Sequence, residues 1–254
     1  MFRSTGAALL GTSALCLSLA APGAVRTAAA FEIEEAGLTI QITPTAATDY
    51  VFRGLSQTRN RPAIQGTLDV EHSSGLYVGA FVSNVTFAGT DARQEVDLLA
   101  GYRFTVAGVK FDLGGVYYTY PGYDRQPGQF RLNWFEFAAR GSYELDPAKF
   151  FASVFYAPDF QAQSRTAVYV EGGVDLKLPG EFTLGGRLGY QWIERNERFG
   201  TPDYLNWSVT LSREIAYGVT ATVGYYDTNI SRSDCVGGQK ICDARVMFTL
   251  SRTF

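Results

Sequence analysis

EVDLLAGYRF, residues 95–104, alternates strictly between two kinds of side chain and decides the fold class of the chain. Its even-numbered positions are apolar or aromatic: Val96, Leu98, Ala100, Tyr102 and Phe104. Its other face carries the charged residues Glu95, Asp97 and Arg103. A period of two residues is that of a β-strand with one apolar and one polar face. Such a strand belongs either to a soluble sandwich or to a membrane-spanning barrel.

The same alternation recurs along the chain, and no stretch after residue 30 shows a sustained helical period. Charges lie deep inside strands of ten or more residues, which is longer than the usual strand of a soluble sheet. About 9–11 residues is the length that a tilted strand needs to cross a bilayer. Aromatic residues gather near strand ends, as in the interfacial girdle of a membrane barrel: Tyr117, Tyr120, Trp192, Tyr225 and Tyr226.

The connections between strands favour the barrel over the sandwich. We predict strands at residues 39–54, 62–72, 76–87, 94–106, 110–120, 131–144, 149–158, 165–177, 181–193, 204–214, 218–230 and 244–254. Every second connection is a tight turn, and those between them are mostly longer and polar, notably 121–130, 194–203 and 231–243. Short periplasmic turns that alternate with longer external loops are typical of outer-membrane barrels. The sequence therefore predicts an all-β fold, a transmembrane antiparallel β-barrel of 12 strands.

A secretory signal peptide is predicted over residues 1–30. Arg3 supplies a positive start, residues 7–25 are apolar and small, and alanines at 28–30 offer a cleavage site. We expect one mature domain, residues 31–254, located in the bacterial outer membrane. Arg3 and Arg26 are the only charged residues of the leader, so the remainder has 20 basic and 25 acidic residues. This mildly acidic domain has no basic cluster, and we expect no nucleic-acid partner.

Two cysteines remain once the leader with Cys16 is removed: Cys235 and Cys242, in the stretch SDCVGGQKICD. An even pair this close in an exported protein predicts a disulfide across a loop. The alternative is two free thiols. The chain has a single histidine, which disfavours a zinc site, and we expect no metal and no cofactor.

The segment TDYVFRGLSQTRNRPAIQG, residues 48–66, is the hardest to place. Read as the end of the first strand, it puts Tyr50 and Phe52 toward lipid, in register with Ile40 and Ile42. Asp49 and Arg53 then face the lumen. The wet side of this strand is the inside of the barrel.

Charged residues on the inward faces are the candidates for lining the lumen. They are Asp49, Arg53, Asp69, Glu71, Glu95, Asp97, Arg103, Asp112, Glu136, Arg140, Glu171, Asp175, Arg187 and Arg245. One interpretation is a charged pore lining that sets ion preference. The other is a ladder of ion pairs between neighbouring strands that fills and stiffens the lumen. Near-equal numbers of both signs leave the two interpretations open.

Residues 48–104 resemble the TorF-type family of proteobacterial outer-membrane porins. The matching pieces are DYVFRG (49–54), SQT (56–58) and PAIQG (62–66), then Asp69, His72, Ser74-Gly75, Tyr77, Gly79, Ser83-Asn84-Val85, Glu95, Asp97 and Gly101-Tyr102. The resemblance implies an outer-membrane barrel of porin type, and it supplies neither a solute nor a catalytic residue. Family knowledge also implies that the final aromatic, Phe254, is read by the barrel-assembly machinery.

Passive passage of small hydrophilic solutes or ions is the predicted function, through a narrow lumen that residues 121–130 constrict by folding inward. One alternative is a lipid-modifying enzyme, for which His72, the sole histidine, is the available base. We interpret His72 as a polar turn residue and predict no enzyme. Another alternative is a surface structural or recognition barrel with a plugged lumen. Outer-membrane lipid is a partner in each case.

Overall fold

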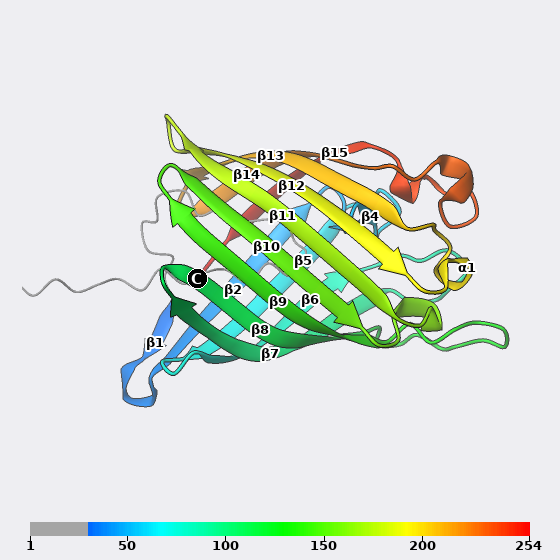
Figure 1. Ribbon diagram of the computed structural model, residues 1–254, viewed down its shortest axis with the longest axis horizontal. Helices are drawn as coiled ribbons and strands as arrows, with labels where there is room; N and C mark the ends of the chain where they lie inside the picture. The colour runs from blue at the N-terminus through cyan, green and yellow to red at the C-terminus, as the bar shows by residue number, and fades with distance from the viewer. Residues whose placement is uncertain (1–29) are drawn as a thin grey trace, which may run out of the picture.

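The computed structural model describes residues 30–254, which form one closed antiparallel β-barrel (Figure 1). Its twelve wall strands are β2 (Leu38–Ala47), β5 (Ala63–His72), β6 (Leu76–Asn84), β7 (Gln94–Val106), β8 (Val109–Thr119), β9 (Trp134–Leu145), β10 (Ala148–Ala157), β11 (Ala167–Leu178), β12 (Phe182–Ile193), β13 (Tyr204–Ala216), β14 (Val219–Thr228) and β15 (Arg245–Arg252). Each pairs with its neighbour in sequence, and β15 pairs with β2 to close the barrel. The predicted 12-stranded barrel is confirmed. The predicted signal peptide lies outside the described residues except for Ala30.

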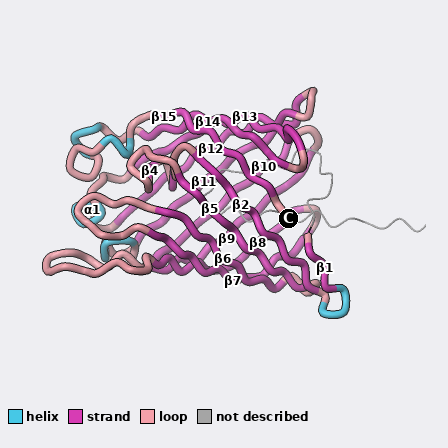
Figure 2. Tube along the Cα trace, turned by 180° about the vertical axis from the view of Figure 1, so that it is seen from behind, coloured by secondary structure: helices cyan, strands magenta, loops and turns pink. Residues whose placement is uncertain are grey.

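The two ends of the barrel differ, as the alternation of connections predicted. Tight turns at 73–75, 107–108, 146–147, 179–181 and 217–218 lie at one end, here called the turn end. The connections 48–62, 85–93, 120–133, 158–166, 194–203 and 229–244 lie at the other, the loop end. The loop end carries the short helices η2 (Gln161–Gln163), α1 (Asn196–Phe199), η3 (Arg232–Asp234) and η4 (Lys240–Cys242), all visible in Figure 2. At the turn end, β1 (Phe31–Ile33) and η1 (Glu34–Ala36) form a hairpin with β2.

The outer surface of the barrel is apolar over most of the strand length. Large hydrophobic side chains stay exposed on every wall strand, among them Ile42, Leu68, Val82, Leu98, Leu113, Phe137, Val154, Val170, Leu188, Val209, Tyr225 and Phe248. The alternate positions face inward, and most of them are buried or half-buried. The alternation read from residues 95–104 is therefore the difference between the two sides of the barrel wall. No helix within residues 30–254 is long and apolar enough to cross a membrane.

The first predicted strand is wrong beyond residue 47. After β2 the chain leaves the wall, and residues 48–62 fold into the lumen as a segment that contains the two-residue strands β3 (Val51–Phe52) and β4 (Leu55–Ser56). We call residues 48–62 the inserted segment. Tyr50 and Phe52 do not face lipid: Tyr50 is 3% exposed, and its ring packs on Phe81 inside the barrel.

The reason for this departure is that the lumen offers aromatic partners of its own. The ring of Phe52 makes edge contacts with Tyr118 and Trp134, whose side chains point inward from β8 and β9. The chain reverses at Arg53 and Gly54, both in the left-handed region with φ of 47° and 82°. A Cβ at Gly54 would lie 2.5 Å from Thr228 Cγ2, so this close approach requires glycine.

Two further expectations are corrected. Tyr120 and Tyr226, assigned to the outer aromatic girdle, are buried inside the barrel, whereas Tyr117, Trp192 and Tyr225 are exposed on the outside. Residues 121–130 do not constrict the lumen. They belong to the long green loop that projects beyond the barrel at the right of Figure 1. The inserted segment, not this loop, occupies the lumen.

Candidate functional site

The candidate site is the inside of the barrel. None of the fourteen charged residues named from the sequence points to the outer surface: each is buried or half-buried. Twelve of them stand on wall strands, and Asp49 and Arg53 reach the lumen on the inserted segment. They form two groups, one in the half of the lumen near the turn end and one beneath the inserted segment. Within residues 30–254, no group of His, Cys, Asp and Glu side chains is suited to hold a metal ion.

Arg103 is the centre of the group near the turn end. Its guanidinium nitrogens lie 2.7 Å from Asp69, 2.5 Å from Glu71 and 3.7 Å from Asp112. The guanidinium also lies over the ring of Tyr77, 3.7 Å from its centroid. Asp112 is shared with Arg140, whose Nη1 lies at 3.2 Å. This cluster ties together strands β5, β7, β8 and β9 on the inside.

A second ion pair lies farther round the wall. Arg187 Nη2 donates to Asp175 Oδ1 at 2.9 Å, and its guanidinium lies over the ring of Phe151. In the half near the turn end, acids and bases are therefore paired between strands, either adjacent ones or, for Arg103 with Asp69 and Glu71, across β6. This part of the lumen matches the interpretation as an ion-pair ladder.

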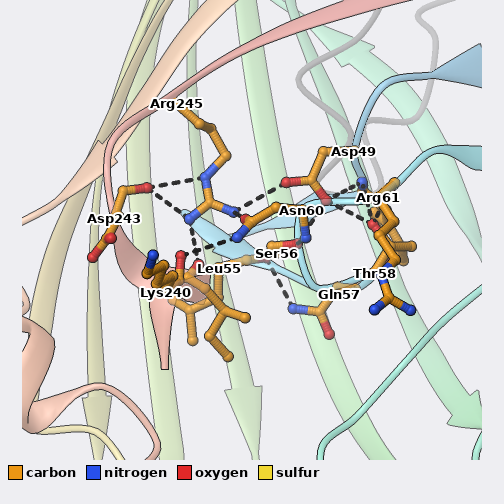
Figure 3. Close-up of polar contacts among 12 residues, drawn as sticks. Asp49, Leu55, Ser56, Gln57, Thr58, Asn60, Arg61, Lys240, Asp243 and Arg245 are labelled. Carbon is orange, nitrogen blue, oxygen red and sulfur yellow. Dashed lines mark hydrogen bonds and ion pairs between the residues drawn. The ribbon is translucent and has the colours of Figure 1, made fainter. Parts of the chain in front are cut away.

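Asp49 anchors the start of the inserted segment (Figure 3). Its Oδ1 accepts hydrogen bonds from the Tyr50 amide at 2.8 Å, Ser56 Oγ at 2.6 Å and Thr58 Oγ1 at 2.7 Å. Its Oδ2 lies 3.0 Å from Arg245 Nη1 on β15. One carboxylate thus folds the segment onto itself and joins it to the wall.

Arg245 also connects the inserted segment to the loop 229–244. The guanidinium donates to Asn60 Oδ1 at 2.8 Å and to the backbone oxygens of Ile241 and Asp243 at 2.5 and 2.6 Å. Asn60 Nδ2 in turn donates to the Lys240 carbonyl at 3.3 Å (Figure 3). Loop and segment are held as one unit.

The predicted disulfide is formed between Cys235 and Cys242, with an S–S distance of 1.96 Å. Both cysteines are buried and pack in one apolar cluster with Leu55 of the inserted segment. Tyr204 and Ile230 complete this cluster. The disulfide therefore braces the loop against which the segment rests.

Arg53 carries the deepest contact of the inserted segment. Its Nη2 lies 2.8 Å from Glu136 Oε2 on β9, and its Nη1 donates to Gln191 Oε1 on β12 at 2.9 Å. Five aromatic rings surround the guanidinium at centroid distances of 4.3 to 6.0 Å: Phe52, Trp134, Phe155, Phe160 and Tyr169. Arg53 and Glu136 are 3% and 1% exposed.

Three further carboxylates lie at this level of the lumen and form no ion pair among residues 30–254: Glu95, Asp97 and Glu171. Glu95 accepts a hydrogen bond from Tyr50 Oη at 2.8 Å, and Glu171 accepts one from Tyr169 Oη at 2.8 Å. The side chain of Asp97 is completely buried beside the carboxyl group of Glu95, with which it interacts directly.

Several residues that complete this site are absent from the candidates named in the sequence analysis. The candidates were the charged residues on inward faces, so the uncharged side chains of Gln191, Trp134 and Tyr169 were not among them. The signal that could have found the inserted segment is the pair Arg53-Gly54, a turn signature in the middle of an apparent strand.

A family model described as "Bacterial protein of unknown function (Gcw_chp)" matches residues 33–254. The chain belongs to the Gcw_chp family. No curated protein sequence matches it. Among solved structures this Gcw_chp barrel is similar to the KdgM porin, with a TM-score of 0.56 and 12% identity over 84% of this chain and 99% of that one.

Two more solved structures show the same likeness. A KdgM porin in complex with disordered oligogalacturonate gives a TM-score of 0.57 at 12% identity, over 84% of this chain and 99% of that one. The NanC porin gives 0.53 at 9% identity, over 84% of this chain and 98% of that one. At such low identity the likeness establishes a shared fold: this Gcw_chp chain has the fold of these porins.

Proposed function

We propose that this protein is an outer-membrane porin that lets small hydrophilic solutes or ions pass down their gradient through a narrow lumen. The observation that carries the proposal is the contrast between the two sides of the closed wall. Exposed apolar side chains cover the outside, whereas the charged side chains of the wall strands lie inside, together with many polar side chains and aromatic rings. A closed barrel also pairs the backbone groups of every strand, which a lipid environment requires.

The dimensions support a membrane location. The wall strands have 8 to 13 residues, which brackets the length that a tilted strand needs to cross a bilayer. Exposed aromatic residues near strand ends, such as Tyr117 and Trp192, suit the two membrane interfaces. The signal peptide over residues 1–30, the single domain over 31–254 and the barrel-assembly machinery belong to this proposal as the route of export and insertion.

The inserted segment defines the width of the proposed pore. A barrel of about eight strands has room only for side chains, whereas 16–18 strands leave a water-filled channel. Twelve strands lie between these limits, and residues 48–62 take up much of the space at the loop end. The finer resemblance to TorF-type porins remains part of the proposal and rests on the motifs between residues 48 and 104.

The enzyme alternative finds little support around His72. Its Nδ1 lies 2.8 Å from Ser74 Oγ at the exposed turn end, an arrangement that an ordinary polar turn produces. The porins that share the fold are channels. The recognition alternative has one observation in its favour, the occupied lumen, and the following experiment separates it from the porin.

Planar-bilayer recording of the purified protein tests the proposal. We expect discrete conductance steps for the wild type, and larger steps when residues 50–60 are replaced by a Gly-Ser linker. The matched control replaces residues 121–130, which project beyond the barrel, and should leave the conductance unchanged. If neither the wild type nor the 50–60 variant conducts at any salt concentration, the porin function is excluded and a plugged recognition barrel is favoured.

A further inference from the structure

The place that Arg53 occupies has the construction of a cation-binding site on the barrel wall. Glu136 supplies a carboxylate, and Gln191 an amide oxygen, at 2.8 and 2.9 Å from the guanidinium nitrogens. The aromatic rings of Trp134, Phe155 and Tyr169 lie within cation–π distance of the guanidinium carbon. All five side chains belong to wall strands β9 to β12, so the site exists independently of the segment that fills it.

The charges around this site are unbalanced without Arg53. Glu95, Asp97, Glu136 and Glu171 are four carboxylates at this level, and Arg53 is the only base that forms an ion pair with any of them in the described chain. The nearest other guanidinium groups, those of Arg140 and Arg187, pair with Asp112 and Asp175. Removal of Arg53 leaves a wall that attracts cations and repels anions.

Arg53 is attached in a way that allows it to leave. It lies at the tip of the β3–β4 hairpin, which forms a separate two-stranded sheet with two pairs of residues in register. No wall strand pairs with β3 or β4, so withdrawal of the hairpin breaks no backbone pairing of the barrel.

We propose that the Glu136–Gln191 site and its aromatic rings bind the guanidinium or alkylammonium group of a cationic solute, and that Arg53 occupies the site when no such solute is present. The inference deepens the proposed porin function, because it names guanidino and amino compounds as the solute class. The planar fork of a guanidinium fits the two oxygen acceptors and the ring faces best. A neutral group forfeits the ion pair with Glu136, and an anionic group is repelled by that carboxylate.

Binding is tested with the Arg53→Ala variant and methylguanidinium as the probe, measured by calorimetry in detergent micelles. N-methylurea, which has nearly the same shape and no charge, is the matched control ligand. We expect Arg53→Ala to bind methylguanidinium and not N-methylurea, and the wild type to bind methylguanidinium more weakly than Arg53→Ala, because Arg53 competes for the site. Glu136→Gln in the Arg53→Ala background should weaken binding by about tenfold or more, the value of one charge-assisted hydrogen bond.

A second variant, which lacks the β3–β4 hairpin, keeps the test decisive if Arg53→Ala does not fold. The protein with residues 50–60 replaced by a Gly-Ser linker keeps the wall site and should show the same preference for methylguanidinium. If neither variant prefers methylguanidinium over N-methylurea, the site is not a cation site and the inference is wrong.

Bilayer recording separates this inference from the porin function. In the conducting Arg53→Ala protein, free arginine should block the current reversibly, and the reversal potential should shift toward that of the cation. Conductance that free arginine does not block supports the porin function and contradicts the proposed cation site. Binding of methylguanidinium without conductance in any variant supports the site and overturns the porin.

Discussion

At the scale of single residues, Asp49 and Arg245 decide where the chain goes after β2. One carboxylate oxygen of Asp49 accepts hydrogen bonds from the Tyr50 amide and from two hydroxyl groups. The other oxygen accepts a hydrogen bond from Arg245. Both side chains of this ion pair are almost completely buried, at 7% and 10% exposure. A buried carboxylate that loses its base is left without compensation, which costs far more than loss of a surface pair.

Replacement of Arg245 tests this residue-scale argument. We expect Arg245→Leu to lower the free energy of unfolding by about 3 kcal/mol or more, because the buried side chain of Asp49 then loses its basic partner. Denaturant unfolding of the refolded barrel measures this. The control is Arg232→Leu, whose pair with Asp243 lies at the surface, and a change below about 1 kcal/mol is expected there. Equal effects for both variants would show that Arg245 has no special role.

At the scale of elements, the loop 229–244 and the inserted segment act as one unit. The disulfide ring packs on Leu55, and Asn60 and Arg245 bridge the two. By loop entropy, a ring of this size stabilises the loop by roughly 2.5 kcal/mol. Loss of the disulfide therefore weakens the surface on which the inserted segment rests.

Proteolysis of intact cells tests this coupling together with the topology. Trypsin should cleave after Arg59, which is exposed, faster in the Cys235→Ser/Cys242→Ser variant than in the wild type. Mass spectrometry identifies the fragment that begins at Asn60. Cleavage within the projecting loop 120–133 serves as the internal control and should not change. Equal rates at Arg59 in both proteins contradict the coupling, and cleavage confined to broken cells places the loop end on the periplasmic side.

The inserted segment also shows where prediction from the sequence stops. Alternation identified the wall strands and the inward face of each charged residue on them, because lipid and lumen demand opposite side chains at every second position. Residues 48–56 keep that alternation, yet both of their faces meet protein. A two-residue period in the sequence shows only that the two faces of a segment differ. It does not distinguish lipid from a lumen lined with Phe81, Tyr118 and Trp134, because both offer apolar contact.

The pairing of side chains within the lumen could not be predicted from the sequence either. The fourteen charged positions could be listed, but Arg53 meets Gln191 across 138 positions of the chain and Glu136 across 83. Such pairs depend on the closure of the barrel and on the path of the inserted segment. The spacing of residues along one strand predicts neither the closure of the barrel nor the path of the inserted segment.

At the scale of the whole molecule, the apolar outer surface is the feature on which membrane insertion depends. Leu188 lies near the middle of β12 and is 56% exposed on the outside, whereas Tyr217 is 87% exposed at the tip of the turn between β13 and β14. In water both positions would accept an arginine at little cost. In a bilayer they lie in different media: the middle of β12 is in hydrocarbon and the turn tip is in water.

The same substitution at these two positions therefore measures the medium around the barrel. We expect Leu188→Arg to lower the free energy of unfolding from phospholipid vesicles by about 2–4 kcal/mol, the cost of an arginine near the bilayer midplane. Tyr217→Arg should change it by less than about 1 kcal/mol, because a turn outside the hydrocarbon keeps the guanidinium hydrated. Equilibrium unfolding in denaturant, followed by the fluorescence of the tryptophans, gives both values. If Leu188→Arg is as harmless as Tyr217→Arg, the outer face of β12 lies in water and the barrel does not span the membrane.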